Sequence, residues 1–140
     1  MITGIESQDD IRKVFIIFSS IWGDETLSEL VISIHTTTCI INKWSGEVVG
    51  YLFYKEDERD KAIEVTDFGV DNGLQNKGIG RQLIEHLFTK TDSIKLTVNV
   101  KNESANALYS KMGFREINRY ENYYGVGSDG LRLVWMKKGD

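Results

Sequence analysis

The sequence contains no proline, one cysteine and two histidines among its 140 residues. It also lacks internal repeats and low-complexity tracts, so nothing marks a domain boundary and we expect residues 1–140 to form one domain. A single cysteine excludes an internal disulfide, and two separated histidines are too few for a zinc site, so we expect no metal. Cys39 lies in an apolar run, which predicts a buried strand residue and not a nucleophile.

Two further absences concern membranes and nucleic acids. No apolar run approaches the length of a membrane span, and no basic and apolar leader opens the chain. We therefore expect a cytoplasmic protein, present as a monomer or a homodimer. The formal net charge of −4 argues against nucleic-acid binding and favours a cationic ligand or substrate.

The spacing of apolar residues predicts alternating helices and strands. Ser7 is placed to cap a first helix that ends near Gly23, and a shorter helix is expected from Glu25 to about Ser33. Two β-rich runs flank the turn Ser45-Gly46 and predict a hairpin. The other expected elements are a charged solvated loop at 56–61, strands at 65–70, 94–100, 114–120 and 131–137, and helices at 79–88 and 103–112.

This order of elements predicts a mixed α/β fold. We expect one central sheet of about six to seven strands, with helices on both of its faces. The strand at 65–70 and the strand at 94–100 should be parallel, because a helix crosses between them.

The segment from Gln75 to Arg81 joins a strand to a strongly periodic helix. A loop at this place directs the free amides of a helix N-terminus, and the positive end of the helix dipole, toward a ligand. Gly78 and Gly80 have no Cβ, so phosphates can approach the backbone, and Lys77 adds positive charge, as does Arg81. The chemistry indicated is pyrophosphate binding, although glycines at this spacing also occur for packing reasons alone. The spacing fits neither the dinucleotide fingerprint nor the P-loop.

A second motif block runs from Asn102 to Phe114. With the loop Gln75-Asn76-Lys77-Gly78-Ile79-Gly80 upstream, it resembles the GNAT superfamily of N-acetyltransferases. The loop resembles that family's Q/R-x-x-G-x-G/A segment, and the second block its N-x-x-A-x-x-L-Y-x-x-x-G-F segment. The resemblance covers essentially the whole chain. It implies a GNAT-like fold and an acyltransferase that moves an acetyl group from acetyl-CoA to a primary amine by direct attack.

The C-terminal part is similar to the ribosomal-protein alanine and protein N-terminal acetyltransferases. Tyr123-Tyr124 followed by Asp129 resembles their Y-Y…D-A-x-x-M ending, but Gly130 replaces the alanine, and Thr97 stands where those enzymes have a glutamate. The implied acceptor is a protein N-terminal amine. One alternative is a polyamine or aminoglycoside-type acceptor. The other is that the protein is a module that binds acetyl-CoA without transferring the acetyl group.

The resemblance also implies roles for single residues. Tyr109 matches the tyrosine whose hydroxyl meets the CoA sulfur, which makes it the expected proton donor, with packing on the sheet as the alternative. Asn102 would contact acetyl-CoA, although it also suits a helix cap. The residues expected to bind acetyl-CoA are the backbone of Phe68 and Val70, the loop residues Gln75, Asn76, Lys77, Gly78, Ile79, Gly80 and Arg81, and Asn102.

The general base is left open between two carboxylates and a water wire. Glu64 resembles in position a glutamate of histone-type members of the superfamily, and Asp67 lies three residues on and faces the other side of the strand. A desolvated carboxylate there would have a raised pKa. We expect the first two helices and the loop at 121–130 to line the acceptor site, with Glu25, Glu29, Tyr123 and Tyr124 as its binding residues. A solvated helix face and rim aromatics are the alternatives.

Overall fold

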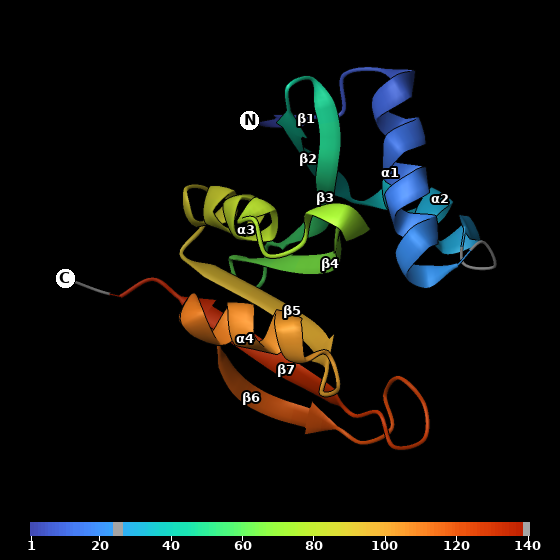
Figure 1. The fold of residues 1–140 in the computed structure, drawn as a ribbon. Helices are drawn as coiled ribbons and strands as arrows, with labels where there is room; N and C mark the ends of the chain where they lie inside the picture. The colour runs from blue at the N-terminus through green and yellow to red at the C-terminus, as the bar shows by residue number, and fades with distance from the viewer. Residues whose placement is uncertain (24–26, 139–140) are drawn as a thin grey trace. The chain divides into compact units, whose positions relative to one another are not determined.

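The computed structural model describes residues 1–23 and 27–138. Seven strands are hydrogen-bonded in the order β1-β2-β3-β4-β5-β7-β6, which confirms the mixed α/β fold. The elements in chain order (Figure 1) are β1 (Ile2–Gly4), α1 (Gln8–Trp22), α2 (Leu27–Thr36), β2 (Thr38–Trp44), β3 (Glu47–Asp57), β4 (Ala62–Val70), η2 (Asn72–Leu74), α3 (Ile79–Phe88), β5 (Ser93–Asn99), α4 (Glu103–Lys111), β6 (Arg115–Tyr120) and β7 (Gly130–Met136).

The chain divides into two compact units. The first comprises Met1–Lys55 and Thr66–Thr89, and the second comprises Glu56–Val65 and Lys90–Asp140. Strand β4 contributes to both units, because the division falls between Val65 and Thr66. That residues 1–140 act as a single domain stays a prediction.

The first helix forms as its end signals predict. The Ser7 hydroxyl accepts a hydrogen bond from the Asp10 amide at 3.2 Å, and α1 ends where Gly23 adopts a φ of 85°. A cap of this kind is worth about 1 kcal/mol. Helix α2 continues to Thr36, three residues beyond the expected end at Ser33. Its expected start at Glu25 lies outside the described residues.

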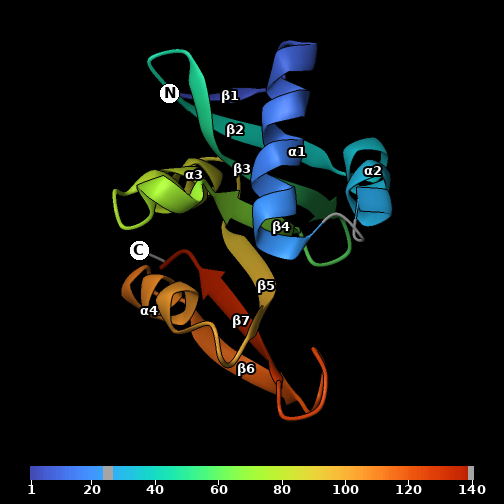
Figure 2. The same ribbon diagram turned by 45° about the vertical axis from the view of Figure 1, so that its right-hand side comes forward.

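Helices pack on both sides of the strands of the first unit. Side chains alternate along a strand, so neighbouring residues face opposite sides. A Cβ built on Gly69 of β4 would meet Ile21 of α1 and the Tyr51 ring, whereas a Cβ on Gly80 of α3 would meet Phe68 and Val70 of β4. The core on the α1 side contains Val14, Ile17, Phe18, Leu30, Ile41, Val48, Tyr51 and Phe53. Figure 2 shows α1 crossing in front of β2 and β4.

Two expectations about the strands were incomplete. Strand β1 was not predicted, because three residues are too few to show an alternating pattern; it pairs antiparallel with β2, with Ile2 opposite Asn42. The charged segment 56–61 was expected to be a loop throughout, yet β3 continues to Asp57. Asp57 accepts a hydrogen bond from the Lys95 ammonium at 2.8 Å, which gives this charged residue a partner on the sheet.

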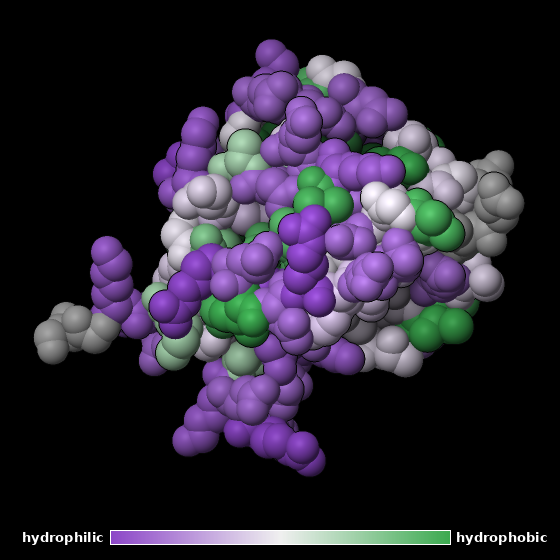
Figure 3. Space-filling view, turned by 90° about the horizontal axis from the view of Figure 1, so that it is seen from below, coloured by the Kyte–Doolittle hydropathy of each residue, from purple (hydrophilic) through white to green (hydrophobic). Residues whose placement is uncertain are grey.

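The second unit is built around β5, whose residues alternate between buried and half-buried positions. Its parallel ladder with β4, predicted from the crossing helix, consists of Ile63 opposite Ile94 and Glu64 opposite Lys95. Strand β7 pairs antiparallel with both β5 and β6. The face of the molecule in Figure 3 is mostly hydrophilic, and its hydrophobic residues form small separate groups. Among the described residues, no helix has the length and apolar character needed to cross a membrane.

The contact at Gly80 leads to a stability prediction. An alanine Cβ there would lie 2.6 Å from Cζ of Phe68, so the ring would have to move within a packed region. We expect Gly80→Ala to lower the free energy of unfolding by about 1–3 kcal/mol, the usual cost of overpacking. Gly73→Ala is the matched control, because its nearest contact is Asp71 Oδ1 at 3.9 Å. Urea denaturation measures both, and equal stabilities of the two variants would contradict the packing role.

Candidate functional site

The loop before α3 presents a helix N-terminus that no side chain caps. Gly78 is the N-cap residue and has a φ of 85°, a left-handed conformation that glycine adopts without strain. The first hydrogen bond of the helix runs from the Gln82 amide to the Gly78 carbonyl at 3.0 Å. The amides of the first turn therefore have no acceptor within the helix, as an anion-binding helix start requires.

A buried asparagine holds this helix start in place. Asn42 of β2 is fully buried, and its side-chain amide donates to the Ile79 carbonyl at 3.3 Å and to Gln82 Oε1 at 2.8 Å. Both bonds end in the first turn of α3. The sequence does not reveal this role, because Asn42 lies 37 residues before Ile79 and in an otherwise ordinary strand.

The two glycines of the loop differ in their surroundings. A Cβ on Gly78 would have no atom within 4 Å, so the space beside it is open to a ligand, whereas Gly80 is buried against Phe68. Packing alone therefore explains the glycine at position 80. Gln75, Asn76 and Lys77 are exposed around the opening.

Arg81, the other expected basic residue, forms an exposed ion pair with Glu85 at 2.9 Å. Such surface pairs contribute little to stability, so Arg81 can exchange Glu85 for another anion. The residues of this loop suit a phosphate group, and their binding of acetyl-CoA stays a prediction.

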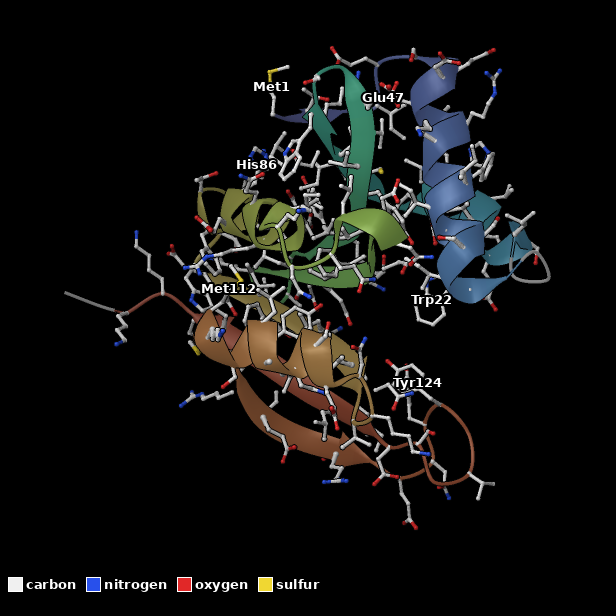
Figure 4. The ribbon with its side chains drawn as sticks, viewed as in Figure 1. Met1, Trp22, Glu47, His86, Met112 and Tyr124 are labelled. Atoms are coloured by element: carbon white, nitrogen blue, oxygen red, sulfur yellow. The ribbon has the colours of Figure 1, made fainter. Side chains whose placement is uncertain are left out.

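Asp67 of β4 is a half-buried carboxylate on the α1 side of the first unit. The Tyr51 hydroxyl donates to one of its oxygens at 3.1 Å, and the Phe68 amide donates to the other at 2.8 Å. Trp22, which projects from the last turn of α1 (Figure 4), lies near this side chain and lowers its pKa. Burial nevertheless raises the pKa of Asp67 above its ordinary value, and the negative charge of Glu29 acts in the same direction.

Phe68 and Val70 were expected to hold the donor through their backbone. Their side chains face α3, where each comes within 3.5 Å of a Cβ built on Gly80. The ladder between β4 and β5 ends at Glu64, although β4 itself continues to Val70. The Phe68 amide already donates to Asp67, so a ligand on that amide would have to replace this bond.

Glu64, the other expected base, lies in the second unit and is engaged by an arginine. One guanidinium nitrogen of Arg132 donates to Glu64 Oε2 at 2.7 Å and to Thr97 Oγ1 at 3.1 Å. The arginine thereby links β4, β5 and β7, which favours a structural role for Glu64. Its role as base stays a prediction. The sequence could not show this contact, because Arg132 and Glu64 are 68 residues apart.

Tyr109 and Asn102 lie on and before α4 in the second unit. Asn102 caps the helix as expected, its side chain accepting from the Ala105 amide at 3.1 Å. Tyr109 is 4% exposed and packs against the Phe114 ring with a centroid distance of 5.4 Å. Packing of Tyr109 is thus observed, and its role as proton donor stays a prediction. The preceding loop is held by Asn106, whose side-chain amide donates to the carbonyls of Asn99, Val100 and Asn102.

Tyr123 and Tyr124 lie in the loop between β6 and β7. Figure 4 labels Tyr124. Their rings meet edge to face at 4.9 Å, and the Tyr124 hydroxyl donates to the Thr97 carbonyl at 3.1 Å. Asp129 fixes the loop by accepting from Arg119 and from the Asn122 amide, both at 2.9 Å.

Gly130, where alanine was expected, has a packing reason. A Cβ there would lie 3.0 Å from the Tyr123 side chain. Of the expected acceptor residues on the helices, Glu29 is exposed on α2, and Glu25 lies outside the described residues. The structure therefore accounts for the glycine, and the acceptor roles stay predictions.

Comparison with known proteins agrees with the two motif blocks. N-alpha-acetyltransferase RimI of Mycobacterium tuberculosis is 36% identical over 99 residues, which cover 68% of this chain and 63% of the relative. The ribosomal protein bS18-alanine N-acetyltransferase of Salmonella typhimurium is 36% identical over 83 residues, which cover 49% of this chain and 56% of the relative. The matches thus span about three fifths of the curated relatives' lengths.

Among solved structures, an aminoglycoside 6'-N-acetyltransferase complexed with coenzyme A superimposes with a TM-score of 0.83 over 100% of this chain and 99% of that one. The two sequences are 13% identical, so this likeness concerns the fold alone. Residues 9–114 match the Acetyltransferase (GNAT) family, which is most of the chain and includes both motif blocks. The chain therefore belongs to the GNAT family of acetyltransferases.

Proposed function

We propose that this protein transfers the acetyl group of acetyl-CoA to a primary amine. The observation that carries the proposal is the uncapped start of α3, with open space beside Gly78. Amides at a helix N-terminus bind phosphate groups, and the exposed Lys77 adds a positive charge at the opening. In the proposal, the backbone from Gly78 to Arg81 holds the pyrophosphate, and backbone groups at Phe68 and Val70 hold the acetyl and pantetheine part.

The proposed reaction is a direct attack of the amine on the thioester carbonyl. The bond between nitrogen and the acetyl carbon forms, and the bond between that carbon and sulfur breaks. Tyr109 gives its proton to the leaving thiolate, and the nitrogen loses a proton to Glu64, Asp67 or a water molecule. Acetyl-CoA supplies an activated acetyl group, and the protein supplies binding, orientation and these proton transfers.

The acceptor that we propose is the N-terminal amine of a protein. The names of the Mycobacterium and Salmonella relatives support it, as does the Tyr123-Tyr124…Asp129 ending. A ribosomal-protein acceptor would place the reaction in the cytoplasm. The second candidate is a small-molecule amine, which the aminoglycoside enzyme of similar fold brings into consideration.

Binding of the pyrophosphate by the loop before α3 can be tested by reversing a charge in the loop. Lys77→Glu reverses an exposed charge, so we expect unchanged stability and an acetyl-CoA dissociation constant raised by about tenfold. S-acetylpantetheine has no pyrophosphate, and its affinity should not change. Lys55→Glu, the same change at another exposed position of the first unit, is the control. Calorimetry that finds equal effects of Lys77→Glu on both donors would contradict pyrophosphate binding by this loop.

The role of Tyr109 can be tested by removing its hydroxyl. Tyr109→Phe keeps the ring that packs on Phe114, so the free energy of unfolding should change by no more than about 1.5 kcal/mol. Acetyl-CoA affinity should be unchanged, and the rate of the chemical step should fall about 10²-fold. Single-turnover kinetics measure that rate. Tyr120→Phe, on β6 of the same unit, is the control. A parental rate in Tyr109→Phe would show that Tyr109 serves packing only.

Direct transfer predicts that the single cysteine is dispensable. Burial raises the pKa of Cys39 to about 12, so its thiol is protonated and a poor nucleophile at neutral pH. We expect Cys39→Ala to keep most of the activity. Mass spectrometry of the protein mixed with acetyl-CoA should find no acetyl group on Cys39, and a kinetically competent acetyl-cysteine would refute direct transfer.

A further inference from the structure

The surroundings of Asp67 bear on which amines the site accepts, an inference that rests on the proposed function. The groups that face this carboxylate come from four elements: Trp22 on α1, Glu29 on α2, Cys39 on β2 and Tyr51 on β3. None of them is a cation. Within the described residues, no lysine, arginine or histidine forms an ion pair with Asp67, and its hydrogen-bond donors, the Tyr51 hydroxyl and the Phe68 amide, are neutral.

Tyr51 fixes the orientation of the Asp67 carboxylate. Its ring is fully buried, and it packs edge to face on Phe53 with a centroid distance of 5.4 Å, so its hydroxyl has little freedom. Burial and the nearby Asp67 raise the pKa of Tyr51, which keeps the hydroxyl protonated as a donor. A carboxylate has about four acceptor positions, and the Tyr51 hydroxyl and the Phe68 amide fill two of them, which leaves room for a further donor.

The ionised carboxylate of Asp67 is destabilised in this environment unless it gains a further partner. A carboxylate removed from water loses hydration, and neutral donors replace it only in part. The raised pKa of Asp67 expresses this cost. Trp22 is 49% exposed at the border of the site, so the place is open to solvent on one side. An ammonium group arriving there would supply the missing opposite charge and could also contact the indole face.

We propose that Asp67, oriented by Tyr51, binds the protonated amine of the acceptor, and that the acceptor carries no carboxylate beside that amine. Like charges brought together at a binding site are strongly unfavourable. A carboxylate on the carbon next to the amine would meet the negative charges of Asp67 and Glu29. A peptide N-terminus or a polyamine avoids this conflict, because its amine is followed by an amide or a methylene group. A free amino acid does not avoid it. Tyr51 is a positioning residue in this proposal, since it acts through Asp67.

Alaninamide and alanine form a matched pair of probes. They share the same amine and methyl group, and only alanine has a carboxylate. We expect calorimetry on the protein loaded with coenzyme A to show at least about tenfold tighter binding of alaninamide. The same ratio should appear in kcat/KM when acetyl-CoA is the donor.

Three variants locate the origin of the preference. Asp67→Asn should weaken alaninamide binding about tenfold or more and bring the ratio of the two affinities toward one. Tyr51→Phe should raise KM for alaninamide and leave the acetyl-CoA dissociation constant unchanged. Asp9→Asn is the control, because it removes an exposed carboxylate from the first turn of α1, about 20 Å along the helix from Trp22. It should keep the full preference.

The outcomes separate this proposal from the proposed function. Equal affinities for the two probes would overturn the role of Asp67, and so would a preference that persists in Asp67→Asn. Either result would do so even if the protein transfers the acetyl group to some amine and releases coenzyme A. Selective binding of alaninamide that depends on Asp67, with no coenzyme A release from acetyl-CoA, would support the site and refute the transferase activity. The binding measurement therefore decides the proposal in either case.

A stability measurement distinguishes a binding carboxylate from a structural one. Because the pKa of Asp67 is raised in the folded protein, ionisation of Asp67 costs stability. That cost is absent below the unfolded-state pKa and complete above the folded-state pKa. The melting temperature of Asp67→Asn, relative to the parent, should therefore rise with pH through that window and stay higher at neutral pH. A variant that becomes less stable relative to the parent as pH rises would show that the charged form stabilises the fold.

Discussion

The alternation of side chains along β4 is the constraint on which the first unit depends. Consecutive residues of a strand face opposite sides, so Asp67 and Gly69 face α1, whereas Phe68 and Val70 face α3. Residues 67–70 of β4 thus contribute on one side to the core under α1 and on the other side to the packing beneath α3. A shift of one residue in its register would exchange the two sides and bury the carboxylate against α3.

Close packing explains three glycines of the first unit, Gly50, Gly69 and Gly80. A Cβ on Gly50 would lie 2.8 Å from Ile79, and one on Gly69 would lie 2.6 Å from the Tyr51 ring. Gly78 differs from these three, because the space beside it is open and its backbone is left-handed, at the start of a helix. A ligand can therefore approach the backbone at Gly78, whereas the packed glycines are explained by the lack of space for a side chain.

The second unit holds its loops with polar side chains. Asn106 donates to three carbonyls before α4, and Asp129 accepts from an arginine and an amide in the loop after β6. Arg132 joins three strands through Glu64 and Thr97. Thr97, where the family resemblance implies a glutamate, therefore belongs to a polar arrangement in which the carboxylate comes from β4 and an arginine holds it.

The sequence by itself determined the order of the α-helices and strands from α1 to β7, the caps at Ser7 and Asn102, the parallel pairing of β4 and β5, and the family. These features depend on local spacing and on motifs contained in short segments, so they can be recognised along the chain. Only the tertiary structure decided which polar groups meet. Tyr51 and Asp67 are 16 residues apart, Asn42 and Ile79 37, and Glu64 and Arg132 68. Hydrogen bonds act over about 3 Å, and the folding of the strands, not distance along the chain, sets which side chains come that close.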